Sequence, residues 1–271
     1  MNKIKILGGS RGAKMSVAGF MSGSGTNLRK IIEFERNYAH KKKSCPFEVV
    51  VIFSDTYNSN APEIGKDFNI PVVIRDIRSF YATKSKKGKQ IQNMEIRAEF
   101  DENTINALSP YNISVIAYAG YMSIASERLV KGFPGVNIHP ADLSIMHGGK
   151  RKYTGAHAVR DAIVAREKHI ASTTHLLDTA VDEGPILMIS PPLKVDYGEN
   201  FDPHNEALLQ HVAAKNQQHL KEKGDWVIFP LTLLYLAEGK FTQDEHNNLF
   251  FDGKRIPYGV KLEEDDSEIR I

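Results

Sequence analysis

The stretch Val17-Ala18-Gly19-Phe20-Met21-Ser22-Gly23-Ser24-Gly25-Thr26-Asn27-Leu28 decides the fold class, because its pattern combines a strand, a glycine-rich turn and the start of a helix. The apolar run Val17–Met21 predicts a buried strand, and helical spacing continues over Leu28–Glu35. Free amides at the start of that helix, with the helix dipole behind them, favour an anion such as phosphate. The turn lacks the third glycine of a dinucleotide-binding fingerprint and the lysine of a P-loop. A plain strand-to-helix turn with a Ser/Thr cap therefore stays an equal alternative.

Short apolar runs alternate with amphipathic stretches along the rest of the chain, which is typical of a parallel sheet wrapped by helices. Further strands are expected at Phe47–Phe53, Val72–Ile74, Ile113–Ala117, Val136–Ile138, His169–Leu177 and Ile186–Ser190. Helices are expected from Asn60 onward and over Gln90–Leu108, Ala156–Arg166, Asn205–Lys223 and Trp226–Glu238. A β-hairpin is expected where Asp252-Gly253 separates Leu249–Phe251 from Lys254–Ile256. We expect Lys84–Lys89 to be a solvated loop and Glu263–Glu268 to be frayed.

Composition excludes several classes of protein. The chain has 271 residues, of which 41% are hydrophobic and 25% charged, as in ordinary globular proteins. A formal net charge of +2 is not the large positive excess that is typical of proteins that bind nucleic acid or membranes nonspecifically. The single cysteine, Cys45, rules out an intrachain disulfide and a cysteine-based zinc cluster. With no apolar run near the ~18 residues of a membrane span and no apolar leader, a cytoplasmic protein is expected.

The segment Asn137-Ile138-His139-Pro140 carries the first candidate catalytic pair. Residues two apart in a strand face the same side, so Asn137 and His139 are expected to project together at the carboxyl end of a short strand. An amide and an imidazole side by side can donate two hydrogen bonds to one developing oxyanion. The alternative is that Asn137 and His139 have only a structural role and make their hydrogen bonds within a loop.

Asp182 is the candidate partner of His139. It lies in the loop that follows His175 and ends at Gly184-Pro185. A carboxylate beside His139 would raise the pKa of the imidazole and keep it cationic. Alternatively, the carboxylate could relay a proton from an attacking amine. Charged residues in a Gly-Pro loop are usually solvated, so a surface carboxylate is the competing interpretation.

Several short motifs follow one another along the chain between Ser16 and Gly259. They are Ser22–Leu28, Ala119-Gly120-Tyr121-Met122, Asn137–Pro140, His175 with Asp182-Glu183-Gly184-Pro185, Phe229-Pro230-Leu231, Ala237-Glu238-Gly239-Lys240 and Phe251–Pro257. On these motifs the chain resembles the folate-dependent formyltransferase family. Among its members, those that formylate phosphoribosylglycinamide in purine biosynthesis match best. The resemblance implies an α/β fold with a doubly wound, mainly parallel (mixed) sheet and helices on both faces.

The resemblance also implies roles for individual residues. Asn137, His139 and Asp182 would be catalytic, with 10-formyltetrahydrofolate as formyl donor and no metal required. The phosphoribosyl acceptor would be held by Gly23, Ser24, Gly25, Thr26, Asn27, Pro140 and Asp225. The folate would contact Arg97, Met122, Ser123, Ile124, Ala125, Val130, Asn137, Asp178 and Thr179. Cationic His139 and Asn137 would stabilise the oxyanion, while Asp182 would hold the charge on His139 and help to move the proton.

Three positions depart from the family pattern. Segment 142–154 (DLSIMHGGKRKYT) is longer than usual and basic. Ser123 stands where familiar members have arginine, and Asp225 stands where a glutamate helps to hold the glycinamide. Lys150, Arg151 and Lys152 in the long segment either form a lid that attracts a phosphorylated acceptor or belong to a solvated surface loop.

Competing functions share parts of this pattern. A formyltransferase or deformylase acting on another amine or on water would use the same chemistry. A chain that resembles the deformylases would, however, be expected to have an extra N-terminal regulatory domain. A methionyl-tRNA formyltransferase would carry an RNA-binding domain, which the low net charge argues against. A nucleotide-binding module would need the glycine turn but not the Asn137, His139 and Asp182 trio. We expect an N-terminal extension over 1–15, a formyltransferase domain over 16–259 and a flexible tail over 260–271. The expected partners are small-molecule substrates, with no nucleic acid and no membrane, for a monomer or homodimer.

Overall fold

The computed structural model describes residues 5–7, 13–84, 93–199 and 201–263. The predicted loop Lys84–Lys89, apart from Lys84, and the predicted frayed end beyond Glu263 lie outside the described residues. Within the described part of the chain, no helix is both long enough and apolar enough to cross a membrane.

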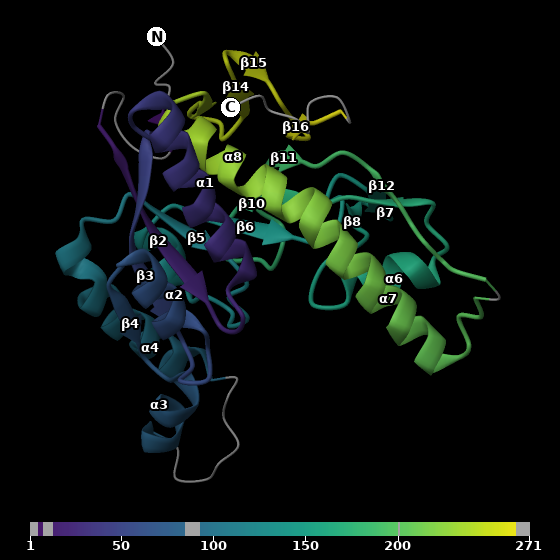
Figure 1. Ribbon diagram of the computed structural model, residues 1–271, viewed down its shortest axis with the longest axis horizontal. Coiled ribbons are helices and arrows are strands. Elements are labelled where there is room, and N and C mark those ends of the chain that lie inside the picture. The colour runs from purple at the N-terminus through teal and green to yellow at the C-terminus, as the bar shows by residue number, and fades with distance from the viewer. Residues whose placement is uncertain (1–4, 8–12, 85–92, 200, 264–271) are drawn as a thin grey trace.

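An eight-stranded sheet forms the centre of the molecule (Figure 1), with strand order β16-β11-β10-β6-β5-β2-β3-β4. Its strands are β2 (Met15–Met21), β3 (Phe47–Ser54), β4 (Val72–Ile74), β5 (Val115–Tyr118), β6 (Gly135–His139), β10 (Thr173–Leu176), β11 (Ile186–Ile189) and β16 (Val260–Lys261). Every neighbouring pair from β4 to β6 is parallel, whereas β10 is antiparallel to both β6 and β11. The sheet is therefore mainly parallel but mixed, which confirms the predicted fold class.

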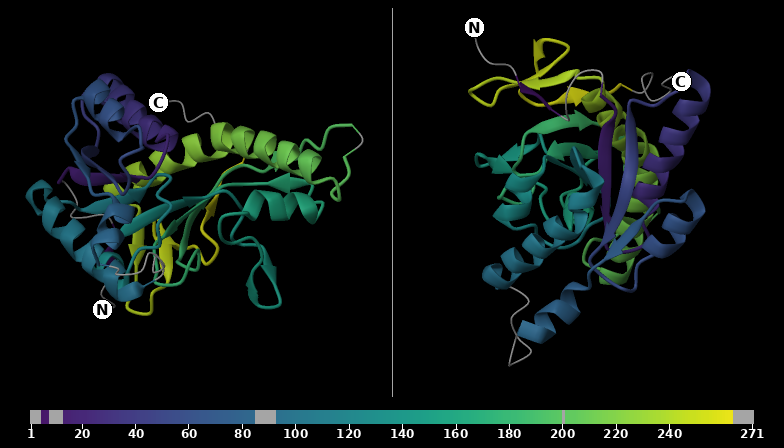
Figure 2. Two further views of the ribbon diagram at one scale, coloured as in Figure 1. Left: turned by 90° about the horizontal axis from the view of Figure 1, so that it is seen from below. Right: turned by 90° about the vertical axis from the view of Figure 1, so that its left-hand side faces the viewer.

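Helices cover both faces of this sheet, as the side view in Figure 2 shows. The helices are α1 (Thr26–Lys42), α2 (Ala61–Phe68), α3 (Ile77–Lys84), α4 (Met94–Leu108), α5 (Glu127–Gly132), α6 (Ala158–Val164), α7 (Glu206–Leu220) and α8 (Trp226–Ala237). Alternate residues of β2 separate two cores: Val17 packs in the cluster that holds residues of α1 and α8, while Ala18 packs with residues of α4 and α5. The chain is thus doubly wound around the sheet.

The close approach of α1 to β2 depends on Gly19. A Cβ atom at Gly19 would lie 2.3 Å from Cδ1 of Leu28, so a side chain there would displace the Leu28 side chain that packs α1 against the strand. Helix α1 begins after Gly25, whose φ of 66° is the left-handed conformation that glycine adopts without strain. These two glycines bring the amino end of α1 against the carboxyl edge of the sheet.

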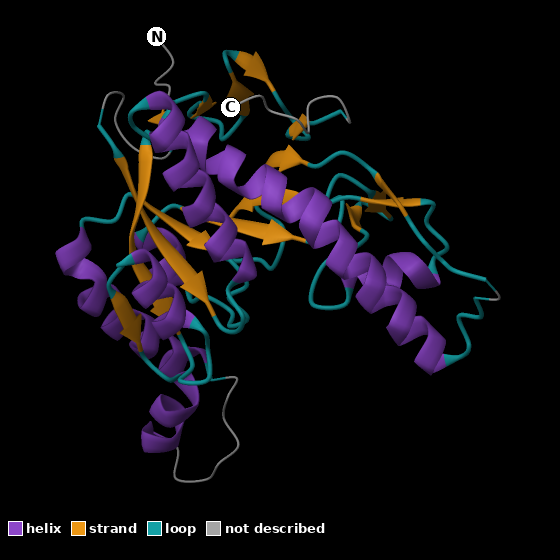
Figure 3. Cartoon of the chain, viewed as in Figure 1, coloured by secondary structure: helices purple, strands orange, loops and turns teal. Residues whose placement is uncertain are grey.

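The two helices expected at Asn205–Lys223 and Trp226–Glu238 are joined into one rod. A π-helical turn over Lys221–Asp225 connects α7 directly to α8, and Figure 3 shows the result as one continuous helical rod. Gly224 lies in this turn, where a Cβ atom would be 2.6 Å from Oγ of Ser172. The turn therefore presses the rod against the start of β10 and points Asp225 inward.

Several other boundaries differ from the sequence predictions. The strand expected at His169–Leu177 is divided into β9 (His169–Ile170), which pairs with β12 (Leu193–Lys194), and β10. Helix α2 begins after Asn60 as expected, but the Asn60 side chain makes no capping hydrogen bond. Helices α3 and α5 were not predicted. Both are short, so their weak periodicity is lost among the neighbouring loops.

Small sheets complete the architecture. The predicted hairpin is present as β14 (Leu249–Phe251) and β15 (Lys254–Arg255), in a sheet with β1 (Lys5–Ile6) and β13 (Phe241–Gln243). A second hairpin, β7 (Met146–His147) and β8 (Lys150–Arg151), lies inside the long basic segment. It turns at Gly148 and Gly149, both with positive φ. This hairpin was not predicted, and it lies next to the candidate site.

Candidate active site

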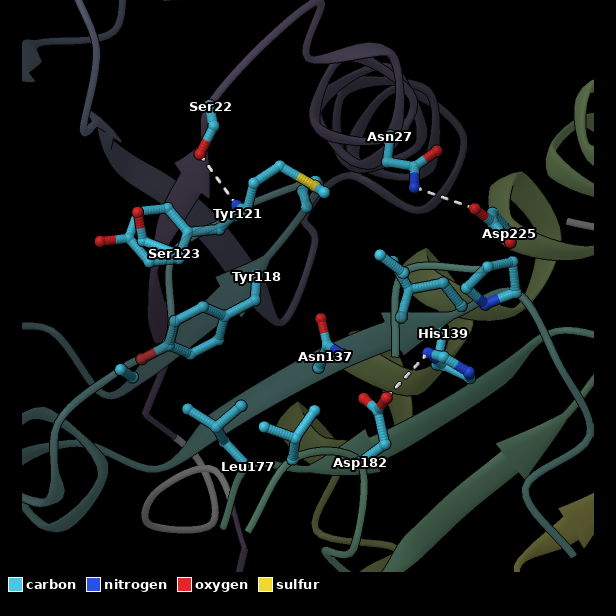
Figure 4. Close-up of a pocket in the computed structure, with 18 of the residues that line it drawn as sticks. Ser22, Asn27, Tyr118, Tyr121, Ser123, Asn137, His139, Leu177, Asp182 and Asp225 are labelled. Atoms are coloured by element: carbon cyan, nitrogen blue, oxygen red, sulfur yellow. Dashed lines mark hydrogen bonds and ion pairs between the residues drawn. The ribbon is translucent and has the colours of Figure 1, made fainter. Parts of the chain in front are cut away.

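A pocket of about 670 Å³ opens at the carboxyl edge of β2, β5 and β6 (Figure 4). Its walls come from the glycine-rich turn after β2, the segment Tyr118–Ala125 after β5, the end of β6 and the loop Leu177–Asp182. One side of the pocket is closed by the α7–α8 rod, through Gln217, Lys221 and Asp225. Because β2 and β5 are neighbours from which the chain winds in opposite directions, this is the topological switch point where open α/β sheets bind ligands.

Hydrogen bonds tie the first two walls together. Oγ of Ser22 accepts a hydrogen bond from the backbone amide of Met122 at 2.9 Å, and the amide of Ser22 donates to the carbonyl of Gly120 at 3.0 Å. The amide of Asn60 donates to the carbonyl of Gly23 at 3.0 Å. The glycine-rich turn is therefore held from both sides.

His139 and Asp182 meet in this pocket, as the sequence predicted. Nδ1 of His139 lies 3.3 Å from Oδ2 of Asp182, and both side chains are buried. The same Oδ2 accepts a hydrogen bond from the amide of Gly155 at 2.7 Å, and Oδ1 lies 3.5 Å from Nε2 of His175. Burial alone would raise the pKa of Asp182, but His175, His139 and the Gly155 amide outweigh it and lower the pKa to about 2. Asp182 is therefore ionised at neutral pH.

The sequence predicts that Asp182 keeps His139 cationic, but burial of the imidazole acts in the opposite direction. Burial lowers the pKa of His139 and outweighs the opposite effects of Asp182 and the Tyr153 carbonyl. Nε2 of His139 faces the carbonyl oxygen of Tyr153 at 2.9 Å. Since a carbonyl only accepts, the neutral ring carries its proton on Nε2 and turns the lone pair of Nδ1 toward Asp182. A proton that reaches Nδ1 would complete a hydrogen bond to an ionised carboxylate.

Asn137 projects from the same face of β6 and is oriented by His175. The two residues are opposite each other in the β6–β10 register, and Nδ2 of Asn137 lies 3.1 Å from Nε2 of His175. Nδ1 of His175 faces the carbonyl of Leu176 at 2.9 Å, while Nε2 lies between the Asn137 amide and Oδ1 of Asp182. The Asn137 amide group is therefore held on one side by the protein, and it lines the pocket, where an N–H can be donated to a ligand.

Asp225 and Asn27 form a buried pair on the opposite wall. Nδ2 of Asn27 donates to Oδ2 of Asp225 at 3.0 Å, and Oγ of Ser172 donates to Oδ1 at 2.5 Å. Oδ1 of Asn27 accepts from Nε1 of Trp226 at 3.1 Å. Burial raises the pKa of Asp225 to about 6 despite these donors. Both residues line the pocket as expected, but the side chain of Asn27 is already engaged by the protein.

Lys221 is the charged pocket residue that sequence reasoning missed. It is the one lysine or arginine that lines the pocket among the described residues, and it lies on the same rod as Asp225. The sequence offered a signal only in the spacing of Lys221 and Asp225. Whether both face one pocket depends on the π-helical turn, which the helical period does not reveal.

Most of the other predicted binding residues line the pocket. They are Gly23, Ser24, Gly25, Thr26, Pro140, Met122, Ser123, Ile124, Ala125, Asp178 and Thr179. Arg97 and Val130 do not line it. Arg97 is buried behind the wall, where Nε and Nη2 bind Asp101 and Nη2 also donates to Oη of Tyr121 at 2.8 Å. Arg97 therefore supports the pocket through Tyr121 instead of facing it.

Ser123 has a partner inside the protein. Its Oγ donates a short hydrogen bond to Oδ2 of Asp55. Behind the same wall, Tyr118 lines the pocket, and its buried hydroxyl has no hydrogen-bond partner among the described residues. A buried hydroxyl without a partner costs free energy unless a ligand or water satisfies it. The hydroxyl is closed off from the pocket, so Tyr118 contributes to the wall through its other atoms.

The basic segment is not a cluster of free cations over the pocket. Nζ of Lys152 pairs with Glu167 at 2.8 Å, and Arg151 donates hydrogen bonds to the backbone carbonyls of Asp182 and Gly184. Lys150, Arg151 and Lys152 do not line the pocket. The interpretation of this segment as a phosphate-attracting lid is therefore wrong.

Comparison with known proteins gives the family. The family model described as formyl transferase matches residues 15–220. This chain belongs to the formyl transferase family. The predicted family is thus confirmed, on a match that includes Asn137, His139 and Asp182 and ends within the α7–α8 rod.

Individual relatives of this formyl transferase are distant in sequence. It is 24% identical over 245 residues to the phosphoribosylglycinamide formyltransferase of Escherichia coli (strain K12), covering 90% of this chain and 96% of the relative. It is 29% identical over 215 residues to a trifunctional purine biosynthetic protein of Chironomus tentans, covering 78% of this chain and 14% of the relative. The solved phosphoribosylglycinamide formyltransferase of Coxiella burnetii has the same fold, with a TM-score of 0.64 at 22% identity over 91% of this chain and 98% of the other.

Proposed function

We propose that this formyl transferase transfers the formyl group of 10-formyltetrahydrofolate to the amine of phosphoribosylglycinamide, a step of purine biosynthesis. The observation that carries the proposal is the pairing of buried His139 with ionised Asp182, next to Asn137, at the centre of the pocket. The names of the relatives support this choice of acceptor, because the E. coli relative is matched over almost its whole length.

The donor is proposed to bind between Met122–Ala125 and the loop Asp178–Asp182. Met122, Ile124 and Val181 on these walls are exposed large apolar side chains, which a flat heterocycle would cover. A cavity of about 670 Å³ falls within the range of small-molecule sites.

The acceptor is proposed to bind between the glycine-rich turn and the α7–α8 rod. Backbone amides at the start of α1 suit a phosphate group, and Lys221 adds a positive charge on the same side. Asp225 lines the same side of the pocket, where its carboxylate can accept hydrogen bonds from hydroxyl or amide donors of the acceptor. The acceptor's amine would then face His139.

The chemistry follows from the geometry. The amine attacks the formyl carbon, and the electron pair of the carbonyl moves to oxygen, where an N–H of Asn137 stabilises the oxyanion. The proton of the new ammonium passes through the Asp182 carboxylate or a water molecule to Nδ1 of His139, which faces that carboxylate, and Asp182 then stabilises the imidazolium. The bond from the formyl carbon to nitrogen N10 of the folate then breaks, and the proton returns to that nitrogen. These steps require no metal.

An assay tests the proposal. The donor analogue 10-formyl-dideazafolate changes its absorbance on deformylation, so turnover can be followed with phosphoribosylglycinamide, with other amines and with water as acceptor. We expect turnover with phosphoribosylglycinamide to exceed turnover with the other amines and with water. Equal rates with and without an amine would instead support a deformylase. The cytoplasmic location, the domain boundaries and a monomeric or dimeric state stay predictions.

A further inference from the structure

We propose that Arg151 is a positioning residue for catalysis, because it clamps the backbone of the Asp182 loop and so holds the Asp182 carboxylate against His139. The inference rests on the proposed function for its kinetic effect. Its structural part, the distance between Asp182 and His139, does not depend on which acceptor is used.

The clamp consists of two hydrogen bonds to the loop backbone. Nη1 of Arg151 donates to the carbonyl of Asp182, and Nη2 donates to the carbonyl of Gly184 at 2.9 Å. One planar guanidinium therefore holds the backbone on both sides of Glu183, the residue between Asp182 and Gly184. The Arg151 side chain is only 12% exposed, so these contacts are largely screened from water.

Asp182 needs such support because of its backbone conformation. Its φ is 56°, the left-handed region that residues with a side chain seldom adopt. In this conformation its carboxylate turns back to accept from Gly155 and to face His139. On the other side, the turn is packed so closely that a Cβ atom at Gly184 would lie 1.8 Å from the carbonyl oxygen of Leu176. Without the clamp, the peptide units around Asp182 could relax toward a commoner conformation.

Arg151 itself is held on a firm base. It ends the hairpin of β7 and β8, and the next residue, Lys152, donates its amide to the carbonyl of Ile145 at 2.9 Å. Tyr153 is buried and donates its hydroxyl to Glu167 at 2.6 Å, while its carbonyl accepts from His139. The same short segment thus contacts His139 through Tyr153 and the Asp182 loop through Arg151.

The pKa of His139 reports on the clamp independently of activity. The charged or titratable groups that act on His139 are Asp182, which raises its pKa, and His175 and Arg151, which lower it. If Arg151 acted only through its charge, the substitution Arg151→Gln would raise the pKa of His139. If Arg151 holds Asp182 in place, the same substitution moves the carboxylate away and the pKa falls. The two roles therefore predict opposite signs.

The experiment measures the His139 pKa by NMR titration of the imidazole nitrogens in the parent protein, Arg151→Gln, Arg151→Lys and the control Lys150→Gln. Lys150 is the exposed neighbour in the same hairpin, so its substitution removes one charge without touching the loop. We expect a lower His139 pKa in Arg151→Gln and a smaller fall in Arg151→Lys, which keeps the charge but not the two-pronged geometry. Lys150→Gln should match the parent. A His139 pKa that rises or stays constant in Arg151→Gln would overturn the inference, whatever the activity.

Kinetics supply the second readout. A misplacement of about 1 Å can cost ~10²-fold in rate, so we expect kcat of Arg151→Gln to fall by about that factor while both KM values stay near those of the parent. Thermal melting of each variant checks that the fold is retained. If the parent itself transfers no formyl group, the proposed function fails while the NMR result still decides on the clamp. If the parent is active and Arg151→Gln is equally active, the positioning role fails.

Discussion

Nδ1 of His139 lies 3.3 Å from Oδ2 of Asp182, although the two residues come from the end of β6 and from the loop between β10 and β11. The pairing joins a ring whose pKa is lowered by burial to a carboxylate whose pKa is held at about 2 by its hydrogen bonds. At neutral pH, the site therefore has an ionised carboxylate behind an uncharged base.

Substitution of Asp182 by asparagine should remove the charge that stabilises the His139 imidazolium. We expect kcat to fall by ~10²–10⁴-fold, the range of general acid–base catalysis, with a much smaller change in folate affinity. Asp182 raises the pKa of His139, so its neutralisation should lower that pKa and move the acidic limb of the pH–rate profile to lower pH. The measurement is kcat against pH for parent and variant. Full activity with an unchanged profile would reduce Asp182 to a structural carboxylate.

Truncation of Asn137 to alanine should remove an oxyanion donor and leave the His139–Asp182 pair intact. Loss of one such donor typically costs ~10²–10³-fold in kcat. We expect the KM values to change little, because the interaction is made mainly in the transition state. Steady-state kinetics with the chromophoric donor analogue give both numbers. A variant that lost only substrate affinity would show that Asn137 binds the ground state.

Replacement of Lys221 by methionine should weaken binding of the phosphorylated acceptor. Loss of a single charge-assisted contact of about 1.5–3 kcal/mol corresponds to a KM for the acceptor that is raised ~10–100-fold, while the KM for the donor is unchanged. Added salt should raise the acceptor KM of the parent more than that of the variant, because salt screens the lost charge. Lys223→Met, in the same turn but exposed, is the matched control. Equal acceptor KM values for the two variants would place the phosphate elsewhere.

Asp225 should make the folded protein less stable as the pH rises. Its pKa is raised from 3.8 to about 6, so the folded state binds the proton more tightly than the unfolded state. Stability from this group is therefore complete below pH 3.8 and is lost as the pH rises toward 6, by up to roughly 3 kcal/mol. Asp225→Asn should lack this loss. Unfolding free energies of parent and variant at pH 4.5 and 7 give the test, and a parallel change in both proteins would contradict it.

Local patterns accounted for much of the site. Side chains alternate between the two faces along β6, which correctly placed Asn137 and His139 on the same face. This period of two is a property of the strand alone. The glycine-rich turn after β2 could be located for the same reason. The assignment of Arg97 to the folate pocket was wrong, because a buried Asp101 one helical turn away and Tyr121 from another segment hold its guanidinium behind the wall.

The sequence by itself determined the main alternation of strands and helices and the family, and it singled out Asn137, His139 and Asp182 as candidates, because these depend on periodicity and on short motifs in the chain. Only the tertiary structure decided how the trio is ionised. Burial lowers the pKa of His139 against the pull of Asp182, and desolvation is set by every segment that covers a group. The same holds for Lys221, which lines the pocket from the start of the π-helical turn. It holds also for Arg151, because the residues beside Arg151 in the sequence do not reveal its hydrogen bonds to the backbone of Asp182 and Gly184. Contacts between segments far apart in the chain arise from packing, and packing is a property of the folded whole.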